Sequence, residues 1–266
     1  MNRAYSSCSG RNIKEPELFI EATSMQRLRN LIKCTLTISG FRPSAGLGGA
    51  IVDKLDARKA YDLWAATYST ESALSFLEEE LAQQMLDGSS HTRLLDAGCG
   101  IGRRIAGVPG AVGMDLSPNM LAAGAASNVV TGDVRAIPFE SDSFDMVWCR
   151  LVLGYVPDLL PAYRELARVC APGGHVFVTD FHPAAAAAGH RRTFNDQAGV
   201  VHEIENYVHT NHIDVALNVG LTLVTHRDAV VGRSIRDFYL RGIGLKAYKR
   251  DEGLKLVSAF LFRRPE

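Results

Sequence analysis

Short apolar runs alternate with amphipathic stretches along most of this chain, and the alternation predicts an α/β fold. The apolar runs have the length of strands, and the stretches between them have helical periodicity. Alternating strands and helices form a mostly parallel sheet, so we expect ligands at the carboxyl ends of the strands. The predicted strands are 94–96, 110–116, 128–132, 144–149, 175–181, 221–225 and 256–262, and the predicted helices are 51–67, 71–86, 159–169, 183–189 and 212–218.

The first strand leads into a loop with glycine at every second position. Asp96 closes the apolar run, and Gly98, Gly100 and Gly102 follow, with Cys99 inside the loop. Glycine permits positive φ and lets a ligand lie against bare backbone. The loop therefore predicts a ligand site. Its order, G-x-G-x-G, differs from the dinucleotide fingerprint G-x-G-x-x-G, whose helix N-terminus faces a pyrophosphate.

Carboxylates also close the next two predicted strands. Asp115 and Leu116 end the second strand, before a serine–proline pair that is typical of a helix start. A carboxylate at that tip can accept hydrogen bonds from both hydroxyls of a ribose, each contributing about 1.5–3 kcal/mol. Asp133 and Val134 follow the third strand, so three strand tips carry candidate ligand contacts.

Three segments of the chain resemble one enzyme family. The stretch from Leu94 to Gly102 resembles motif I of the class I S-adenosylmethionine (SAM)-dependent methyltransferases, and residues 139–180 resemble the same family. Residues 61–68 are similar to the aromatic segment of its ubiquinone-biosynthesis-like, methyltransferase type 11 branch. The resemblance implies a Rossmann-like, doubly wound seven-stranded sheet of order 3-2-1-4-5-7-6, with strand 7 antiparallel. It also implies SAM as cofactor and S-adenosylhomocysteine as its product.

The resemblance further implies where the cofactor lies. In this family the end of the third strand lies beside the adenine ring, which assigns Asp133 and Val134 to the cofactor site. The remaining contacts are expected at the glycine loop, the other strand tips and the aromatic segment. The expected cofactor site comprises Asp96, Gly98, Cys99, Gly100, Gly102, Asp115, Leu116, Asp133, Val134, Arg150, Tyr61 and Tyr68.

The aromatic segment has two interpretations. Tyr61, Trp64 and Tyr68 are spaced i, i+3, i+7 and share one face of the helix predicted for 51–67. Aromatic residues at this spacing usually pack in a core, and we expect this of Trp64. For Tyr61 and Tyr68, packing and a lid role stay open; a ring near the sulfonium would attract it by about 0.5–2 kcal/mol.

Two arginines follow the glycine loop. Arg103 and Arg104 begin a segment to Pro109 that leaves room for only about two helical turns. Positive charge at a helix N-terminus is disfavoured by the macrodipole. This inconsistency indicates a second role, in which an arginine pairs with a carboxylate or reaches the methionine carboxylate of the cofactor.

The chain divides into an extension and one domain. Residues 1–50 carry seven basic and three acidic residues, and we expect a poorly ordered or loosely docked extension there. A methyltransferase domain is expected over 51–266. After the fifth strand, residues 192–195 and 200–207 predict the two arms of a hairpin. This hairpin forms a lid of about 190–210 over the carboxyl edge, where the acceptor must bind.

Methyl transfer from a sulfonium is an in-line displacement, so the protein must align donor and acceptor and exclude water. A hydroxyl acceptor would also need a base. His182, directly after the fifth strand, and Tyr155, in the loop after the fourth, are the candidate catalytic residues; a structural role is the alternative for both. Histidines cluster from His182 to His212, but no H-E-x-x-H motif is present, and we predict no metal.

The composition narrows the choice of partners. The 29 basic and 29 acidic residues balance, which gives no general attraction to nucleic acid or to an anionic membrane. No apolar run is long enough to span a bilayer, and five cysteines without a C-x-x-C pair favour a reducing, cytoplasmic compartment. We therefore predict an enzyme that methylates a small molecule at an O, N or C atom. No motif indicates an oligomeric state.

Three other functions compete with this prediction. A nicotinamide-dependent oxidoreductase is disfavoured by the spacing of the glycine loop. A nucleic-acid methyltransferase is disfavoured by the balanced charge and by the absence of an N/D-P-P-Y stretch after the fourth strand. A SAM-binding partner subunit without catalysis conflicts with no residue of the sequence.

Overall fold

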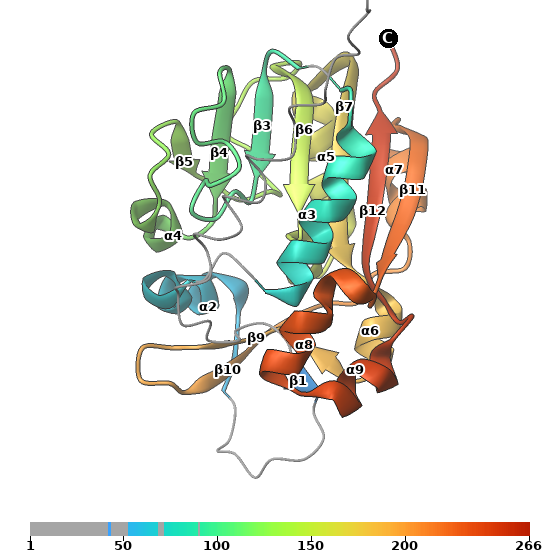
Figure 1. The fold of residues 1–266 in the computed structure, drawn as a ribbon. Helices are drawn as coiled ribbons and strands as arrows, with labels where there is room; N and C mark the ends of the chain where they lie inside the picture. Colours follow the sequence, from blue (N-terminus) through green and yellow to red (C-terminus); the bar gives the residue numbers. More distant parts are fainter. Residues whose placement is uncertain (1–41, 44–52, 69–71, 90) are drawn as a thin grey trace, which may run out of the picture. The chain divides into compact units, whose positions relative to one another are not determined.

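The computed structural model describes residues 42–43, 53–68, 72–89 and 91–266, which are coloured in Figure 1. Of the extension expected over 1–50, only Arg42–Pro43 is described; it forms strand β1, which pairs antiparallel with β8 (His190–Arg191). The rest of that extension lies outside the described residues. The domain boundary near residue 50 therefore stays a prediction.

Seven strands form the main sheet, and their order confirms the predicted topology. From edge to edge the order is β11-β12-β7-β6-β3-β4-β5, and β12 runs antiparallel to both of its neighbours. The other neighbouring pairs are parallel. The strands are β3 (Leu94–Ala97), β4 (Ala111–Asp115), β5 (Val129–Thr131), β6 (Phe144–Arg150), β7 (Cys170–Phe181), β11 (Thr222–Val230) and β12 (Lys255–Arg263).

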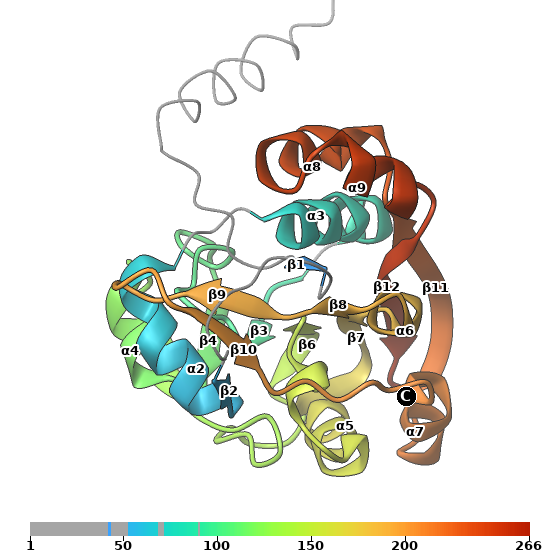
Figure 2. The ribbon, with the colours of Figure 1, turned by 90° about the horizontal axis from the view of Figure 1, so that it is seen from below.

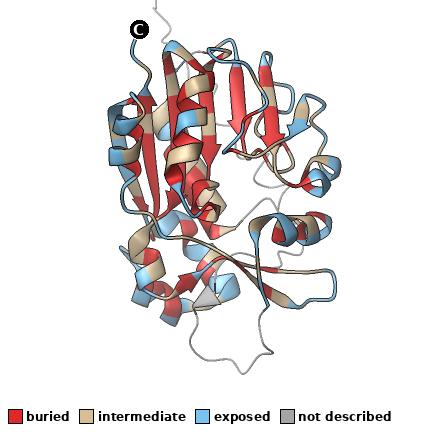
Figure 3. Ribbon diagram, turned by 180° about the vertical axis from the view of Figure 1, so that it is seen from behind, coloured by how far each residue is buried: buried red, intermediate tan, exposed pale blue. Residues whose placement is uncertain are grey.

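Helices cover both faces of this sheet (Figure 2). Helix α3 (Ala73–Leu86) lies on one face with α8 (Arg236–Gly242) and α9 (Leu245–Asp251), whereas α5 (Leu159–Val169) and α7 (His212–Asn218) lie on the other. The central strands are therefore buried on both sides, as the red strands in Figure 3 show. This burial explains why they read as continuous apolar runs. Within the described part of the chain, no helix is long and apolar enough to cross a membrane.

Polar side chains fix where two helices begin. Ser117 accepts a hydrogen bond from the N–H of Met120 at the start of α4 (Pro118–Ala123). Asp158 accepts one from the N–H of Leu160 at the start of α5. Both starts were predicted, because a cap is an interaction within a few residues of sequence.

The helix predicted for 51–67 begins later than expected. Within that range, Lys54–Leu55 forms strand β2, and helix α2 covers Ala57–Trp64. A 3-10 turn, η2 (Ala65–Thr67), follows it. Asp56 sets this start, because its backbone is extended and its side chain accepts a hydrogen bond from the N–H of Lys59.

The short helix expected after the glycine loop is also a wrong prediction. Residues 103–109, all of them described, form turns. Gly102, Gly107 and Gly110 all have positive φ, which a right-handed helix does not accommodate. The chain therefore passes from the glycine loop to β4 through turns alone.

The hairpin predicted after the fifth strand is present, beyond the short helix α6 (Pro183–Ala187). Strands β9 (Thr193–Asn195) and β10 (Val201–Ile204) pair antiparallel, and β2 joins β10 in parallel. We call β2, β9 and β10 the small sheet. In Figures 1 and 2 the small sheet and α2 lie across the carboxyl ends of the parallel strands.

The sequence prediction missed the elements between the last two strands. Strand β11 continues to Val230, past the predicted end at residue 225. The 3-10 turn η4 (Arg233–Ile235) then leads into α8 and α9. These helices have seven residues each, which is too short for a clear helical period in the sequence.

Two glycines of the turn before β4 allow a matched test of packing. Gly107 and Gly110 have φ of 75° and 71°, but only at Gly110 would a Cβ collide with backbone, 1.9 Å from the Thr92 carbonyl oxygen. We expect Gly107→Ala to cost about 1 kcal/mol of unfolding free energy, from the left-handed backbone alone. Gly110→Ala should cost at least about 2 kcal/mol more. Urea unfolding measures both, and equal costs would contradict the packing.

Candidate functional site

A cavity lies at the carboxyl ends of β3, β4, β5 and β6, and we call it the strand-tip cavity. Its wall combines the glycine loop, the chain after β4 and β5, the aromatic face of α2, and Arg192. Arg192 lies between β8 and β9. The structure thus brings together residues that are far apart in sequence. The predicted site residues that line the cavity are Tyr61, Tyr68, Gly98, Cys99, Gly100, Asp115, Leu116, Asp133, Val134, Arg150 and Tyr155.

The glycine loop presents bare backbone to this cavity. Gly98 has a φ of 87°, and a Cβ there would lie 2.1 Å from Cγ2 of Val152. The N–H groups of Gly98 and Cys99 both donate to the carbonyl oxygen of Met114 in β4, at 2.7 and 2.9 Å. The loop is therefore pinned to the neighbouring strand, and no larger residue fits at Gly98.

Asp115 ends β4 and is tied to two backbone N–H groups. One carboxylate oxygen accepts from Gly100, at 2.7 Å, and the other from Ser117, at 2.9 Å. Burial raises the pKa of Asp115, and these two hydrogen bonds oppose the shift. Each carboxylate oxygen can accept a further hydrogen bond, so Asp115 can hold a ligand that carries two hydroxyl donors.

Asp133 is held differently, at the end of β5. Its carboxylate forms two-pronged contacts with the guanidinium of Arg135, with Nη2 at 2.5 Å and Nε at 3.0 Å. The hydrogen bond from Arg135 holds the pKa of Asp133 below its usual value. Asp133 and Val134 therefore line the cavity, and the carboxylate of Asp133 is already paired with Arg135.

Asp96 does not line the cavity, and this differs from the prediction. It is completely buried in β3, and neither carboxylate oxygen has a hydrogen-bond partner among the described residues. Burial raises its pKa, against the attraction of Arg104 and Arg150. Gly102 also lies outside the cavity lining. Asp96 precedes the glycine loop in β3 and Gly102 ends the loop, so both lie behind the part of the loop that faces the cavity.

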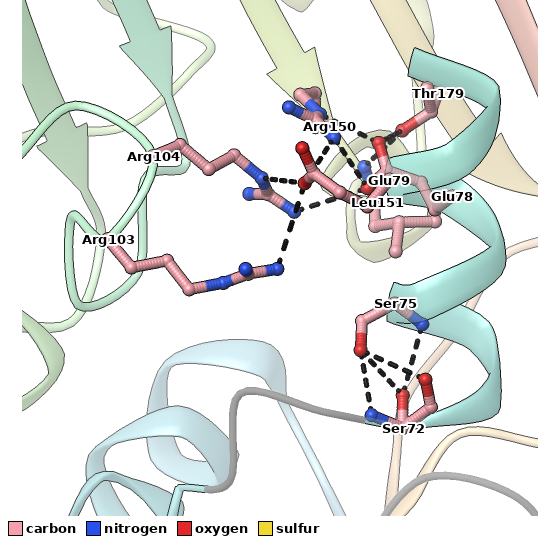
Figure 4. A network of polar contacts seen from close by, with 9 residues as sticks. All are labelled: Ser72, Ser75, Glu78, Glu79, Arg103, Arg104, Arg150, Leu151 and Thr179. Atoms are coloured by element: carbon pink, nitrogen blue, oxygen red, sulfur yellow. Dashed lines mark hydrogen bonds and ion pairs between the residues drawn. The ribbon is translucent and has the colours of Figure 1, made fainter. Parts of the chain in front are cut away.

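An ion-pair network beside the cavity was not predicted (Figure 4). Glu78 of α3 is completely buried. Its carboxylate accepts hydrogen bonds from Arg150 Nε, at 2.7 Å, and from Arg150 Nη2, at 2.9 Å. Arg104 Nη2 lies 3.2 Å from Glu78, and the Thr179 hydroxyl donates to Glu78 at 2.9 Å. Burial acts to raise the pKa of Glu78, but the two guanidinium groups hold it below its usual value. The network thus joins α3, the turns after the glycine loop, β6 and β7.

The two arginines after the glycine loop take different positions. Arg104 is mostly buried and pairs with Glu78 and Glu79, which fits the predicted pairing with a carboxylate. Arg103 lies 3.9 Å from Glu79, is one-third exposed and also lines the cavity. The sequence contained a signal for this network. It has three successive glutamates, Glu78 to Glu80, and a pair of arginines directly after the glycine loop.

The aromatic face of α2 closes the other side of the cavity. The hydroxyl groups of Tyr61 and Tyr155 lie 2.8 Å apart, and their rings meet edge to face. Trp64 is buried against Phe194 of β9, which confirms its core role, and Tyr68 packs edge-on against Trp64. Burial raises the pKa values of Tyr61 and Tyr155, so both phenols are protonated at neutral pH.

His182 lies in a different cavity, together with His209, His212 and His226. Its Nδ1 accepts a hydrogen bond from the N–H of Ala184, which caps α6, and burial lowers its pKa. The structure therefore does not bring His182 to the glycine loop. Among the described residues, no group of three or more His, Cys, Asp or Glu side chains is arranged to hold a metal ion.

The chain is similar in sequence to known methyltransferases. Residues 95–178 match the family model described as a methyltransferase domain. A malonyl-[acyl-carrier protein] O-methyltransferase from Erwinia pyrifoliae is 36% identical over 134 residues, covering 47% of this chain and 51% of that protein. One from Dechloromonas aromatica is 30% identical over 182 residues, covering 65% and 64%. The chain thus spans between half and two thirds of these curated relatives.

A solved structure shows the same fold. The crystal structure of an S-adenosylmethionine-dependent methyltransferase from Mesorhizobium loti has a TM-score of 0.53 against this chain at 21% sequence identity. The match covers 71% of this chain and 98% of that one. At this identity the likeness concerns the fold alone.

The ion-pair network gives a pH-dependent prediction. Glu78→Gln leaves Arg150 buried with its main counter-charge removed, so we expect a loss of about 3 kcal/mol of unfolding free energy at pH 7. Because the folded pKa of Glu78 is lowered, its contribution is complete above the usual glutamate pKa of about 4.3 and is lost as the pH falls through the folded value. The difference in unfolding free energy between wild type and Glu78→Gln should therefore become smaller at low pH.

Urea unfolding at pH 7 and at pH 3.5 measures this gap. Glu80→Gln is the matched control, because Glu80 lies on the same helix and no ion pair of it is found among the described residues. The control should change stability by less than about 0.5 kcal/mol. If the loss of unfolding free energy in Glu78→Gln is small at pH 7, or does not change with pH, the charge of Glu78 does not stabilise the fold.

Proposed function

Because this chain belongs to the class I SAM-dependent methyltransferase family, we propose that it transfers a methyl group from SAM to a small-molecule acceptor. S-adenosylhomocysteine is the second product. One observation carries the proposal: a single cavity combines bare backbone at Gly98 with a carboxylate, Asp115, at the tip of the next strand. This combination suits an adenosyl ligand and needs no group that binds a pyrophosphate.

The residues present fit the cofactor. Gly98 leaves room for a ligand against the loop, and both oxygens of Asp115 can accept the ribose hydroxyls. Asp133 and Val134 flank the adenine ring. Arg103, whose contact with Glu79 is long, pairs with the methionine carboxylate. When bound, the cofactor supplies an activated methyl group, and the protein aligns the acceptor with it and excludes water.

The proposal changes three of the sequence-based assignments. Asp96 and Gly102 have no direct contact with the cofactor, because neither lines the cavity. Arg150 lines it, but its guanidinium is engaged by Glu78 and Glu79, so we propose that it positions the loop rather than binding the cofactor.

On the acceptor side, the small sheet and α2 cover the cavity. We propose oxygen as the acceptor atom, because the two curated relatives are named O-methyltransferases of malonyl-[acyl-carrier protein]. The protonated hydroxyl of Tyr155 donates a hydrogen bond that orients the acceptor. His182 has no part in the reaction, since it faces a different cavity.

A labelling experiment tests the function as a whole. The protein is incubated with methyl-labelled SAM and a metabolite extract, and the labelled products are identified by mass spectrometry. Methyl transfer predicts a labelled small molecule together with an equal amount of S-adenosylhomocysteine. SAM binding without any labelled product would favour a non-catalytic partner subunit, and tight binding of a nicotinamide cofactor instead of SAM would favour an oxidoreductase.

The ribose contact gives a binding prediction. Asp115→Ala should weaken SAM binding at least tenfold, or about 1.4 kcal/mol, because two hydroxyl groups lose their acceptor. Isothermal titration calorimetry measures the affinity. Asp237→Ala, at an exposed aspartate of α8, is the control and should bind as the wild type does. Unchanged SAM affinity of the Asp115→Ala protein, with its thermal stability retained, would refute the ribose assignment.

The two candidate catalytic residues give opposite predictions. Tyr155→Phe removes one hydroxyl and should lower kcat/KM for the acceptor about five- to tenfold, the equivalent of one hydrogen bond, with SAM affinity unchanged. His182→Asn keeps a side chain that can cap α6 and should stay within about twofold of wild type. Rates of S-adenosylhomocysteine release, with the acceptor identified by labelling, decide between them. A slow His182→Asn enzyme with a normal Tyr155→Phe enzyme would reverse the assignment.

A further inference from the structure

The segment between β11 and β12 carries a local excess of positive charge. The whole chain has 29 basic and 29 acidic residues, but residues 233–250 include six basic residues and a single acidic one, Asp237. This segment forms η4, α8 and α9, and we call its exposed side the α8–α9 surface. The basic residues, all exposed, are Arg233, Arg236, Arg241, Lys246, Lys249 and Arg250.

Protein carboxylates neutralise little of this charge. Arg250 pairs with Asp251, with Nε 2.6 Å from Oδ1. For the other five basic residues, no ion pair is found in the part of the chain that the structure describes. Arg241 lies over the ring of Phe238 instead, with its guanidinium carbon 5.3 Å from the ring centre. Stacking on a ring leaves the N–H donors in the plane of the guanidinium available to a partner.

Two exposed leucines lie in the middle of this surface. Leu240, in the last turn of α8, is 37% exposed, and Leu245, the first residue of α9, is 43% exposed. Each leucine is followed directly by a cation, Arg241 or Lys246. Single exposed apolar residues are ordinary on protein surfaces. Here, however, the turn between two helices presents an apolar pair together with unpaired positive charge.

Buried aromatic residues hold this turn against the rest of the domain. Tyr239 of α8 and Tyr248 of α9 are buried, and their rings meet edge to face with centres 5.8 Å apart. Phe238 packs against Phe76 of α3, with ring centres 5.4 Å apart. Figure 2 shows α8 and α9 beside α3, and Ser75 in the first turn of α3 lines the strand-tip cavity. One helix therefore borders both the cavity and the α8–α9 surface.

This combination suits a membrane surface. The boundary between headgroups and acyl chains takes up leucine side chains, and anionic headgroups attract lysine and arginine. We propose that the α8–α9 surface docks on an anionic phospholipid membrane, with Leu240 and Leu245 inserted at the headgroup boundary. The proposal concerns where the protein binds, and it does not depend on the proposed methyl transfer.

Other polyanions match this surface less well. The phosphates of a nucleic acid would pair with the cations but would leave both leucines in water. Protein interfaces are enriched in aromatic anchors and depleted in lysine. The α8–α9 surface has two exposed lysines, Lys246 and Lys249, and its aromatic residues Phe238, Tyr239 and Tyr248 are buried or half-buried. A membrane uses both the charge and the leucines, so we expect both to be needed for binding.

Binding to vesicles tests the proposal with the full chain. Co-sedimentation compares vesicles of phosphatidylcholine alone with vesicles that contain about one third phosphatidylserine. We expect binding to the anionic vesicles only, and weaker binding at high salt. The double variants Leu240→Ser/Leu245→Ser and Arg241→Gln/Lys246→Gln should each weaken this binding at least about tenfold. All four side chains are exposed, so the fold should persist in both variants.

Two matched controls remove the same kinds of side chain elsewhere. Leu217→Ser/Val224→Ser changes exposed apolar residues of α7 and β11, and Arg93→Gln/Arg164→Gln changes exposed cations outside the surface. Both should bind anionic vesicles as the wild type does. Equal binding to both kinds of vesicle, or no binding to either, would overturn the proposal. So would normal binding by the leucine variant, or tight binding of an RNA oligonucleotide without vesicle binding.

Fluorescence gives a second readout, which reports insertion directly. The chain has two tryptophans, Trp64 and Trp148, and the wild-type spectrum accounts for both. In Leu245→Trp, the emission of the added indole should move to shorter wavelength when anionic vesicles are added. In Leu217→Trp it should not move. An unchanged Leu245→Trp spectrum while the protein is bound to vesicles would overturn the insertion. Because neither measurement needs an acceptor, such a failure leaves the proposed methyl transfer standing.

Discussion

The candidate site depends on the hydrogen bonds between the glycine loop and the end of β4. Asp115 accepts from the Gly100 N–H, and the Met114 carbonyl accepts from Gly98 and Cys99. These bonds fix a loop of small residues that has little side-chain packing of its own. The second oxygen of Asp115 accepts from Ser117, where α4 begins. The conformation of the loop, the direction of the carboxylate and the start of the next helix are therefore one arrangement, so a change in any of them displaces the others.

Buried charge is the second constraint, and it separates the arginines of the cavity wall by role. The sequence places several of them near the strand tips, but burial decides which can meet a ligand. Glu78 and Glu79 together pair with Arg104 and Arg150, and this pairing fastens α3 to β6 and to the turns after the glycine loop. Arg192 is also buried, but no ion pair of it is found in the described part of the chain. Within this cavity, pairing with buried carboxylates thus identifies Arg104 and Arg150 as arginines that hold the fold.

The sequence predicted the parts of the molecule that local rules determine. Strand order, the glycine loop, the cap at Ser117 and the carboxylate at Asp115 all follow from short motifs and from the resemblance they carry. The parts it missed depend on contacts between distant segments. His182 follows β7 directly, yet its side chain caps α6 and lines another cavity. Glu78 is one of three successive glutamates, and only the packing of α3 shows which of them is buried.

Helix α2 connects the two sides of the cavity. Toward the cofactor side, Asp62 accepts a hydrogen bond from the Ser117 hydroxyl at the start of α4. Toward the acceptor side, Trp64 stacks on Phe194 of β9, and the preceding strand β2 pairs with β10. The hydrogen bond from Tyr61 to Tyr155 lies between these attachments. Since one short segment contacts both the helix beside Asp115 and the small sheet, the packing of α2 sets the spacing between these two walls of the cavity. A displacement of α2 would therefore change the width of the cavity even if every contact of the glycine loop with β4 were kept.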